Sequence, residues 1–293
     1  MDSHDILQRF VFEHEPVRGE YVHLDATWAA VLARHDYPAP LRILLGEMMA
    51  AAALLSATLK FNGSLIMQLQ GGGPVSLAVV ECTDGLTMRA TAKWRGALQD
   101  GGGLRQLVGN AGHFAITISP QDGGQAYQGI VALEGNNMAE ILARYMRHSE
   151  QLETCFQLTA DGERAAGMLL QRMPGEAGED PDAWNRAERL ASTLTDAELI
   201  GLQLREILHR LYHEEDLRLF DPLPVAFGCH CTRQRVAGVL RMLGYDEVKK
   251  LLAEHGAVEA DCEFCNQHYR FDAVDTEQVF ASEILAAPAQ GRH

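Results

Sequence analysis

The sequence predicts an α+β protein with three parts: an N-terminal domain built on a largely antiparallel sheet with helices, a helical linker, and a small C-terminal domain that binds zinc through four cysteines. In the first 173 residues, short apolar runs bounded by Gly, Pro or Asp alternate with longer helical patterns. An acidic segment and a capped amphipathic pattern follow, and four of the six cysteines lie from Cys229 onward. We therefore expect domains at 1–175, 176–225 and 226–293.

Length and composition limit the class of protein. The chain has 293 residues, 47% of them hydrophobic, which suits two domains with real cores and excludes wholesale disorder. With 25 Lys and Arg against 40 Asp and Glu, the formal net charge is −15, so nucleic acid is not an expected partner. The most apolar run, 48–59, is shorter than the roughly 20 residues of a membrane span, and we find no signal peptide. We expect a cytoplasmic protein with no membrane partner.

The N-terminal domain is predicted from period-two and helical patterns. The strands are expected at 63–70, 75–82, 86–94, 114–119, 126–133, 154–159 and 164–172. The helices are expected at 26–34, 40–60 and 138–148, the last with Asn136 or Asn137 as its N-cap. Cys82 and Cys155 fall in predicted strands, where a free cysteine behaves as a small buried hydrophobe.

The middle of the chain predicts a linker followed by helix. Residues 173–182 are rich in Pro, Gly and acid and offer almost nothing to bury, which is typical of a linker. The zone 183–220 is predicted to be helical, and Thr195 with Glu198 forms a capping-box pattern at the start of an amphipathic helix over 195–212. The apolar stripe of this helix must pack on something, and we expect it to dock on the N-terminal sheet. Its candidate residues are Ile200, Leu204, Ile207, Leu208 and Leu211.

The last zone predicts two short helices, a strand and a closing helix. Val236, Val239, Leu240 and Leu243 make one apolar stripe ended by Gly244, and Val248, Leu251 and Leu252 make a second, with Gly256 as its cap. Residues 268–273 alternate like a strand that buries Tyr269 and Phe271, and a helix opens at Asp275.

The cysteine spacing predicts a metal site. Cys229 and Cys231 form a CxC pair, thirty residues intervene, and Cys262 and Cys265 form a CxxC pair. Two close pairs joined by a folded insert are what a tetrahedral zinc site with four cysteine ligands needs. A zone this small has too few apolar residues to fold without a further stabilising element. Binding of a structural zinc ion contributes on the order of 10–16 kcal/mol to the free energy of folding. His230 and His268 lie next to the cysteines as alternative ligands, although four sulfurs already complete the shell.

Several functions remain compatible with this spacing. A plain structural zinc ribbon would use the site only to hold the tail together. A redox switch would use the same thiolates, because oxidation of either pair removes two ligands at once. A thiol–disulfide oxidoreductase would need an exposed thiol of low pKa at a helix N-terminus, whereas this CxxC precedes a predicted strand. A nucleic-acid-binding zinc module is disfavoured by the net charge.

The whole chain resembles the redox-regulated heat-shock protein 33 chaperone family, also called HslO or 33 kDa chaperonin. The segments that carry the resemblance are Gly228–Arg235 (GCHCTRQR), Cys262–Phe271 (CEFCNQHYRF), Leu133–Met138 (LEGNNM) and His148–Gln151 (HSEQ). The position between the CxC cysteines, here His230, varies in the family and is not a ligand in its pattern.

The resemblance implies an ATP-independent holdase rather than an enzyme. The reduced form, which holds one zinc ion, would be inactive. Oxidants would form Cys229–Cys231 and Cys262–Cys265 disulfides, zinc would leave, and the C-terminal domain and the linker would lose structure. Unfolding client proteins would then bind the freed apolar surface, for which the stripe on 195–212 is our candidate, and the active form would be a homodimer. We expect the Cys262–Cys265 disulfide to form first, because the CxC disulfide ring is tighter and more strained.

Overall fold

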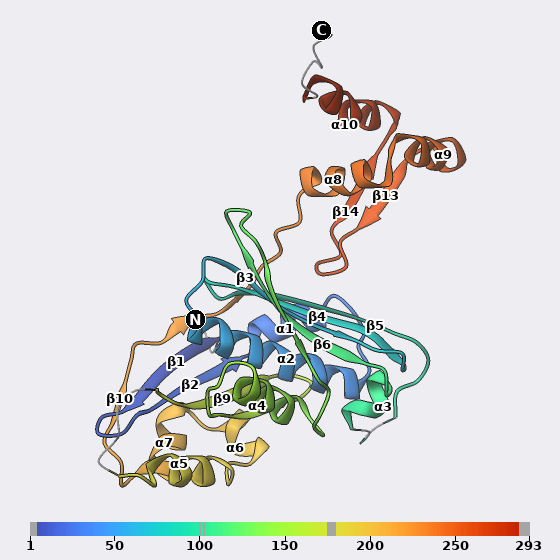
Figure 1. The fold of residues 1–293 in the computed structure, drawn as a ribbon. Coiled ribbons are helices and arrows are strands. Elements are labelled where there is room, and N and C mark those ends of the chain that lie inside the picture. Colours follow the sequence, from blue (N-terminus) through green and yellow to red (C-terminus); the bar gives the residue numbers. More distant parts are fainter. Residues whose placement is uncertain (1–4, 100, 102, 175–179, 287–293) are drawn as a thin grey trace. The chain divides into compact units, whose positions relative to one another are not determined.

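The structure divides into two compact units, Met1–Gly228 and Cys229–His293. It is a computed structural model that describes residues 5–99, 101, 103–174 and 180–286 (Figure 1). The linker predicted at 173–182 therefore lies partly outside the described residues. The helical region that follows it belongs to the first unit, so the contacts give two units where the sequence suggested three segments.

The first unit contains two six-stranded sheets rather than the single sheet that the sequence suggested. The strands of the first sheet are β1 (Ile6–Phe12), β2 (Val17–Leu24), β8 (Thr154–Ala160), β9 (Ala165–Arg172), β10 (Leu217–Leu219) and β11 (Leu223–Pro224). They are antiparallel, in the order β10-β1-β2-β9-β8, and β11 also pairs with β1. The strands of the second sheet are β3 (Gly63–Gln70), β4 (Val75–Thr83), β5 (Thr87–Trp94), β6 (His113–Pro120), β7 (Tyr127–Val131) and β12 (Ala226–Phe227). Their order is β12-β5-β4-β3-β6-β7, and the β12–β5 pair alone is parallel.

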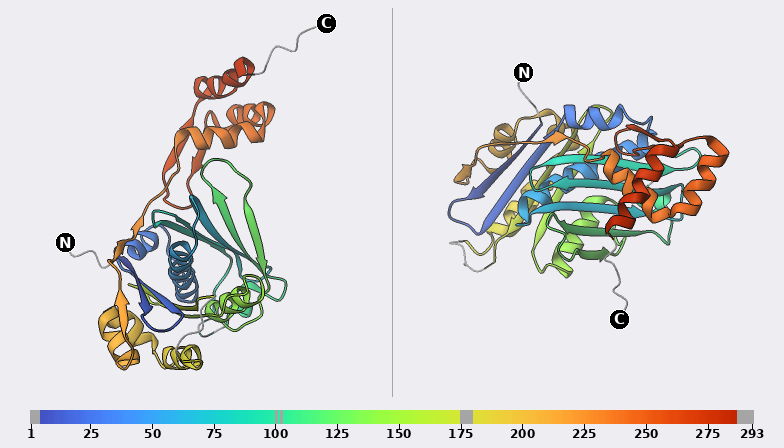
Figure 2. Two further views of the ribbon diagram at one scale, coloured as in Figure 1. Left: turned by 60° about the vertical axis from the view of Figure 1, so that its left-hand side comes forward. Right: turned by 90° about the horizontal axis from the view of Figure 1, so that it is seen from above.

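The helix α2 (Ala39–Thr58) lies between the two sheets (Figure 2). It is apolar nearly all round, so it needs apolar neighbours on every side. Residues of both sheets supply them in one continuous core. By length and composition α2 could also span a membrane, but most of it is buried inside this unit, as expected of a core helix. The shorter helices α1 (Ala26–Leu32), α3 (Leu104–Val108) and α4 (Met138–His148) complete this layer.

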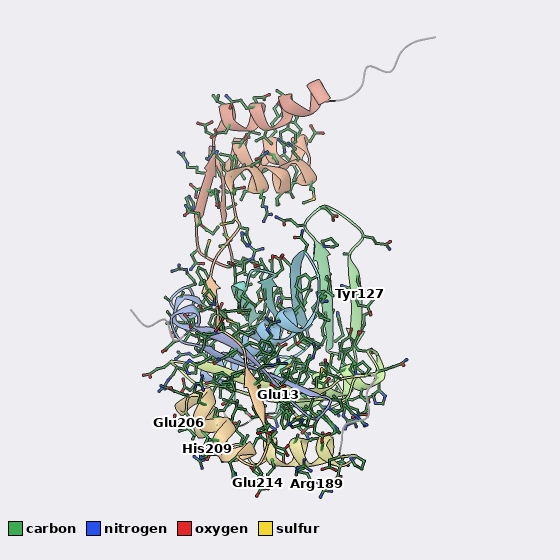
Figure 3. The ribbon with its side chains drawn as sticks, turned by 90° about the vertical axis from the view of Figure 1, so that its left-hand side faces the viewer. Glu13, Tyr127, Arg189, Glu206, His209 and Glu214 are labelled. Atoms are coloured by element: carbon green, nitrogen blue, oxygen red, sulfur yellow. The ribbon has the colours of Figure 1, made fainter. Side chains whose placement is uncertain are left out.

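Three helices cover the other face of the first sheet: α5 (Ala183–Ala191), α6 (Asp196–Gly201) and α7 (Leu204–Tyr212). Their apolar faces form a second core with Phe10 and Phe12 of β1 and Met168 of β9. Their polar faces point away from the sheet, as Figure 3 shows for Arg189, Glu206 and His209. The ion pairs of Arg186 with Asp180 and Glu215 tie α5 to the segments on both sides of it.

The helix predicted over 195–212 is interrupted. Leu202 has extended backbone angles, which end α6, and Gln203 then caps α7. The capping box of Thr195 and Glu198 is confirmed. The apolar stripe continues across the break because both short helices turn the same face to the sheet. The helical zone predicted to reach 220 is wrong at its end, since 217–219 pairs with β1 as a strand.

The strands β3 to β9 and the helices α1, α2 and α4 match the prediction to within a few residues, and Asn137 is the N-cap of α4. The short helix α3 was not predicted. The strands β1 and β2 were not predicted, because charged residues and a glycine interrupt their apolar pattern. The glycine, Gly19, lies opposite Phe10. A Cβ atom at Gly19 would lie 2.1 Å from the Phe10 ring, so the ring occupies the space that a side chain would need.

The second unit is small. It consists of α8 (Arg233–Leu243), α9 (Tyr245–His255), the hairpin of β13 (Val258–Asp261) and β14 (His268–Phe271), and α10 (Ala273–Ala286). Gly256 ends α9 with a left-handed conformation, as predicted. The stripe predicted on α8 is partly wrong: Leu240 is buried, but Val239 and Leu243 are each 51% exposed. The buried face of α8 is instead formed by Ala237 and Leu240.

Candidate metal centre

The CxC pair lies in the loop that enters α8. Cys229 is the first residue of the second unit and Cys231 follows it by two residues. The Thr232 hydroxyl then accepts a hydrogen bond from the backbone N–H of Arg235 at 3.2 Å, which caps α8. The start of α8 is therefore fixed immediately after Cys231, and this limits where both sulfurs can lie.

The CxxC pair lies in the turn of the β13–β14 hairpin. The backbone N–H groups of Cys265 and Asn266 both donate to the carbonyl of Cys262, at 3.3 and 2.7 Å. Asn266 takes a left-handed conformation with φ of 58°, which a short polar side chain tolerates. The Cys262 N–H donates to the Gln267 carbonyl at 3.0 Å and closes the turn. The turn brings both sulfurs to the same side of the hairpin.

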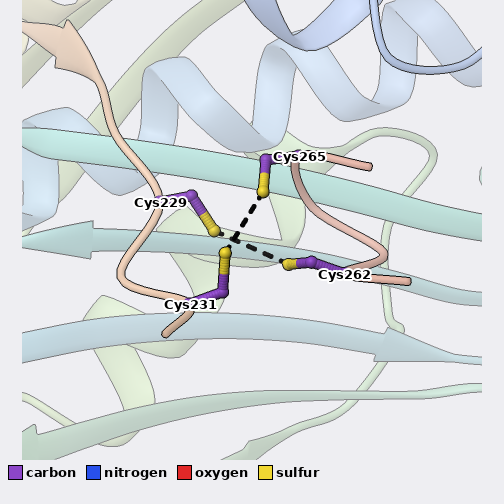
Figure 4. A group of neighbouring side chains, drawn as sticks. All are labelled: Cys229, Cys231, Cys262 and Cys265. Atoms are coloured by element: carbon purple, nitrogen blue, oxygen red, sulfur yellow. Dashed lines mark hydrogen bonds between the residues drawn. The ribbon is translucent and has the colours of Figure 1, made fainter. Parts of the chain in front are cut away.

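The four sulfurs form one cluster, in which all of them lie within 4.8 Å of one another (Figure 4). The Sγ atoms of Cys229 and Cys262 are 3.7 Å apart, and those of Cys231 and Cys265 are 3.3 Å apart. Tetrahedral zinc with Zn–S bonds of about 2.3 Å would place its sulfurs about 3.8 Å apart. The residues therefore fit a single tetrahedral cation, and each close contact joins one sulfur of each pair.

The electrostatics of the cluster favour a cation. Burial raises the pKa of the Cys262 thiol, and it raises the pKa of the Cys265 thiol to about 12. These two thiols therefore retain their protons when no cation is bound. A divalent cation reverses that preference because it stabilises thiolates directly. The donor set of four soft sulfurs suits zinc among the common metals.

Two side chains to which the sequence analysis gave no role at the metal site contact the centre and the elements around it. The Tyr269 hydroxyl, from β14, donates a hydrogen bond to the Cys231 sulfur at 3.2 Å. Arg233, two residues after Cys231, packs over the Phe271 ring at 4.3 Å and donates to the Arg270 carbonyl at 2.8 Å. It also pairs with Asp275 of α10 at 2.7 Å. These contacts depend on how the hairpin and helices pack, so spacing along the chain gave no signal for them.

The two candidate histidines are not part of the sulfur cluster. The group of possible ligands in the described chain contains the four cysteines, without His230 or His268. His230 is exposed, and the Nδ1 atom of His268 lies 2.8 Å from a carboxylate oxygen of Asp261.

The two remaining cysteines are buried in the first unit. Cys82 lies in β4 and Cys155 in β8, with 0% and 9% of their surface exposed. Burial raises the pKa of each thiol to about 12, so both are protonated at neutral pH and poorly reactive. This agrees with their predicted role as small hydrophobes.

The candidate client-binding residues lie in the first unit, apart in sequence from the cysteines. They line the faces of α6 and α7 that pack on the first sheet. Four of them are almost completely buried: Leu204, Ile207, Leu208 and Leu211. Ile200 is half-buried at the edge of the same core. The predicted packing of the stripe on the sheet is therefore present, and its surface is covered.

Comparison with known proteins identifies the family. The profile of the Hsp33 protein family matches residues 5–272. The 33 kDa chaperonins of Methylobacillus flagellatus and Chromobacterium violaceum are 52% and 50% identical to this chain, and each alignment covers at least 99% of both proteins. The crystal structure of the 33 kDa chaperonin (heat shock protein 33 homolog) from Thermotoga maritima shares the fold, with a TM-score of 0.78 at 20% identity over 96% of this chain and 99% of that one. The chain belongs to the Hsp33 family.

Proposed function

We propose that this protein is a redox-controlled, ATP-independent chaperone of the holdase type, which binds unfolding proteins after its cysteine site is oxidised. The observation that carries the proposal is the site itself. Two sequence-close cysteine pairs share one cation-sized centre, in a unit whose described core has seven buried apolar residues. We assign one zinc ion to the reduced form. The name 33 kDa chaperonin of its relatives supports the chaperone role.

Oxidation of either pair removes half of the ligands. Zinc, when bound, holds the four sulfurs as thiolates, the form of cysteine that oxidants react with. One thiolate of a pair attacks a peroxide oxygen, so that a sulfenic acid forms and hydroxide leaves. Its partner thiolate attacks that sulfur, a disulfide forms, and a second hydroxide leaves. Two electrons pass from the pair to the peroxide, and both sulfurs lose the charge that held the ion.

The expected disulfides are Cys229–Cys231 and Cys262–Cys265, and we expect the second to form first. The CxC ring is smaller and more strained, so its disulfide is less favourable. A site left with two thiolates no longer retains its ion. The second unit then loses the free energy that the ion supplied and unfolds.

The surface that we assign to clients is the covered face of α6 and α7 together with the sheet beneath it. The chain runs from α7 through β10, β11 and β12 directly into Cys229. Unfolding of the second unit would therefore release the end of this segment. Once freed, the apolar stripe and its docking surface would expose more contiguous apolar area than a monomeric protein normally shows.

The remaining parts of the proposal concern the cell and the assembly. We place the protein in the cytoplasm, where reduced thiols persist until oxidative stress occurs. The active form would be a homodimer that acts by binding, without turnover of a substrate, and nucleic acid and membranes would not be partners. The net charge of −15 would help keep a protein soluble while it exposes apolar surface.

The direct test compares reduced and oxidised protein. Zinc content and suppression of citrate synthase aggregation are measured before and after peroxide treatment at elevated temperature. We expect zinc to be released and aggregation to be suppressed only after oxidation. Zinc that stays bound after oxidation, or full activity of the reduced protein, would contradict the switch. Strong turnover in an insulin-reduction assay would instead favour an oxidoreductase, and a plain zinc ribbon would show neither activity.

The client surface has its own test in Leu208→Asp. A buried charge on the inner face of α7 should detach the helix, so the reduced variant should already suppress aggregation. The matched control is His209→Asp, which places the same charge on the exposed face one residue later (Figure 3). Equal aggregation in both reduced variants would show that docking of α7 is not what hides the client surface.

A further inference from the structure

The sulfurs of the two halves of the metal centre receive hydrogen bonds of different origin. In the CxxC half they come from the turn backbone: the N–H groups of Phe264 and Cys265 donate to the Cys262 sulfur, and that of Gln267 donates to the Cys265 sulfur. In the CxC half, Cys231 receives its hydrogen bond from the Tyr269 hydroxyl at 3.2 Å. That donor is a side chain and comes from the opposite half of the site.

The position of Tyr269 is fixed by the hairpin. Its backbone is paired with Ala260 of β13, and it stands four residues after Cys265. Its side chain is half-buried against the small core of the second unit, and Phe271, two residues on, is buried in that core. The hydroxyl is therefore held at Cys231 only while β13 and β14 remain paired.

We infer that Tyr269 is a positioning residue that restrains oxidation of the CxC pair. This inference rests on the proposed redox function. A hydrogen bond to a thiolate withdraws electron density from the lone pairs with which the sulfur attacks an oxidant, and such partners of ligand atoms tune metal sites strongly. Cys231 is thus less reactive than its exposure alone would allow.

The same contact links the two oxidation steps. A Cys262–Cys265 disulfide forms as peroxide takes two electrons from that pair and two hydroxide ions leave. The turn then no longer supplies two ligand sulfurs, and the hairpin that carries Tyr269 loses the ion that stabilised it. Departure of the hydroxyl removes this hydrogen bond from Cys231, which regains a proton once the ion has left. The Cys231 thiol then reacts with a second peroxide, giving a sulfenic acid and water. The Cys229 thiol attacks that sulfur, the second disulfide forms, and a second water leaves, so that two electrons pass to the peroxide. Tyr269 therefore couples the state of the CxxC half to the reactivity of the CxC half.

The test is Tyr269→Phe in the full-length, reduced, zinc-loaded protein. Alkylation of each cysteine by iodoacetamide, a neutral electrophile, is followed by mass spectrometry, together with the order of disulfide formation in peroxide. We expect Cys231 to be alkylated on the order of tenfold faster than in the unsubstituted protein, with Cys262 and Cys265 unchanged. The Cys229–Cys231 disulfide should also form earlier.

The matched control is Tyr245→Phe. It removes one hydroxyl from the same unit, but that hydroxyl donates to a carboxylate oxygen of Glu277 at 2.6 Å and not to a sulfur. Its alkylation pattern should match that of the unsubstituted protein.

The possible outcomes separate this inference from the proposed function. Unchanged alkylation of Cys231 in Tyr269→Phe would overturn the inference, even if oxidation still releases zinc from the unsubstituted protein. Equal acceleration at all four cysteines would also overturn it, because Tyr269 would then only help to fold the unit. If the unsubstituted protein kept its zinc after oxidation, the proposed function would fail. The alkylation rates would still report on the hydrogen bond, because they require no oxidant.

Discussion

Outside the metal centre, Glu20 of β2 is a carboxyl in an unfavourable environment. Its side chain is only 2% exposed, and its Oε2 atom has no hydrogen-bond partner in the described part of the chain. Burial raises the pKa of this carboxyl to about 7, although the nearby Arg18 opposes the shift. Between about pH 4.5 and 7 the folded protein therefore holds a proton that the unfolded chain has released. The free energy of unfolding should fall as the pH rises through this window.

We predict that Glu20→Gln removes this loss. At pH 8 the variant should be more stable than the unsubstituted protein by up to about 3 kcal/mol, the cost of ionising a carboxyl whose pKa is raised by this much. Near pH 4 the two should be similar. Urea unfolding followed by tryptophan fluorescence at several pH values measures this difference. Glu163→Gln, at an exposed carboxylate, is the control and should have no such pH dependence. A Glu20→Gln effect that does not vary with pH would contradict the prediction.

At the residue scale, the sequence could predict contacts between residues that are close together along the chain. Cys229, Cys231, Cys262 and Cys265 are brought together as expected, because two short spacings suffice to pair sulfurs and one folded insert joins the pairs. The contact of Tyr269 with Cys231 spans 38 positions and depends on the register of a hairpin whose first strand was not predicted.

At the scale of elements, prediction succeeded where the apolar period was clean. The strands β3 to β9 and the helices α2 and α4 match closely, since each has a regular pattern and clear ends. The failures have physical causes. The interruption at Leu202 keeps the apolar stripe in phase, so periodicity could not reveal it. The strands β1 and β2 mix charged or polar side chains with apolar ones: Arg18 donates to the Gln171 side chain, and the His23 ring contacts the Ile200 carbonyl.

The β1–β2 pairing itself can be tested at Gly19. We predict that Gly19→Ala lowers the free energy of unfolding by about 1–3 kcal/mol, since the added Cβ would overlap the Phe10 ring that packs over this glycine. Gly162→Ala, in the turn between β8 and β9, is the control because no atom lies within 4 Å of its added Cβ. The two variants are compared by urea unfolding. Equal stability would show that the Phe10 ring can move aside.

At the scale of the whole molecule, the two units differ in what holds them together. The first has two extensive apolar cores, one around α2 and one beneath α5 to α7. The second has a core of seven buried apolar residues in its described part and a cysteine centre that fits one cation. The cysteine spacing and the small size of the last zone predict that the second unit depends on zinc, and this stays a prediction. The sequence could not show that the helical region folds as part of the first unit, because an amphipathic pattern does not indicate which surface the helix packs against.

We therefore predict that removing the metal unfolds the second unit and leaves α2 and the two large sheets of the first unit folded. Structural zinc contributes about 10–16 kcal/mol, more than a domain of this size gains from its apolar core. After treatment with chelator and reductant, the amide protons of α8, α9, α10 and the β13–β14 hairpin should exchange rapidly, while those of α2 and both large sheets stay protected. Any change in tryptophan fluorescence should come from Trp184, which lies in the core beneath α5 to α7, because no tryptophan lies in the second unit. Added zinc should restore protection.

The control is a variant with both Cys262→Ser and Cys265→Ser. The amide protons of its second unit should exchange rapidly even before treatment, and chelator should not change their exchange rates. If α8 to α10 remained equally protected without metal, the ion would not be holding this unit folded, and oxidation of the cysteines could not act by unfolding it.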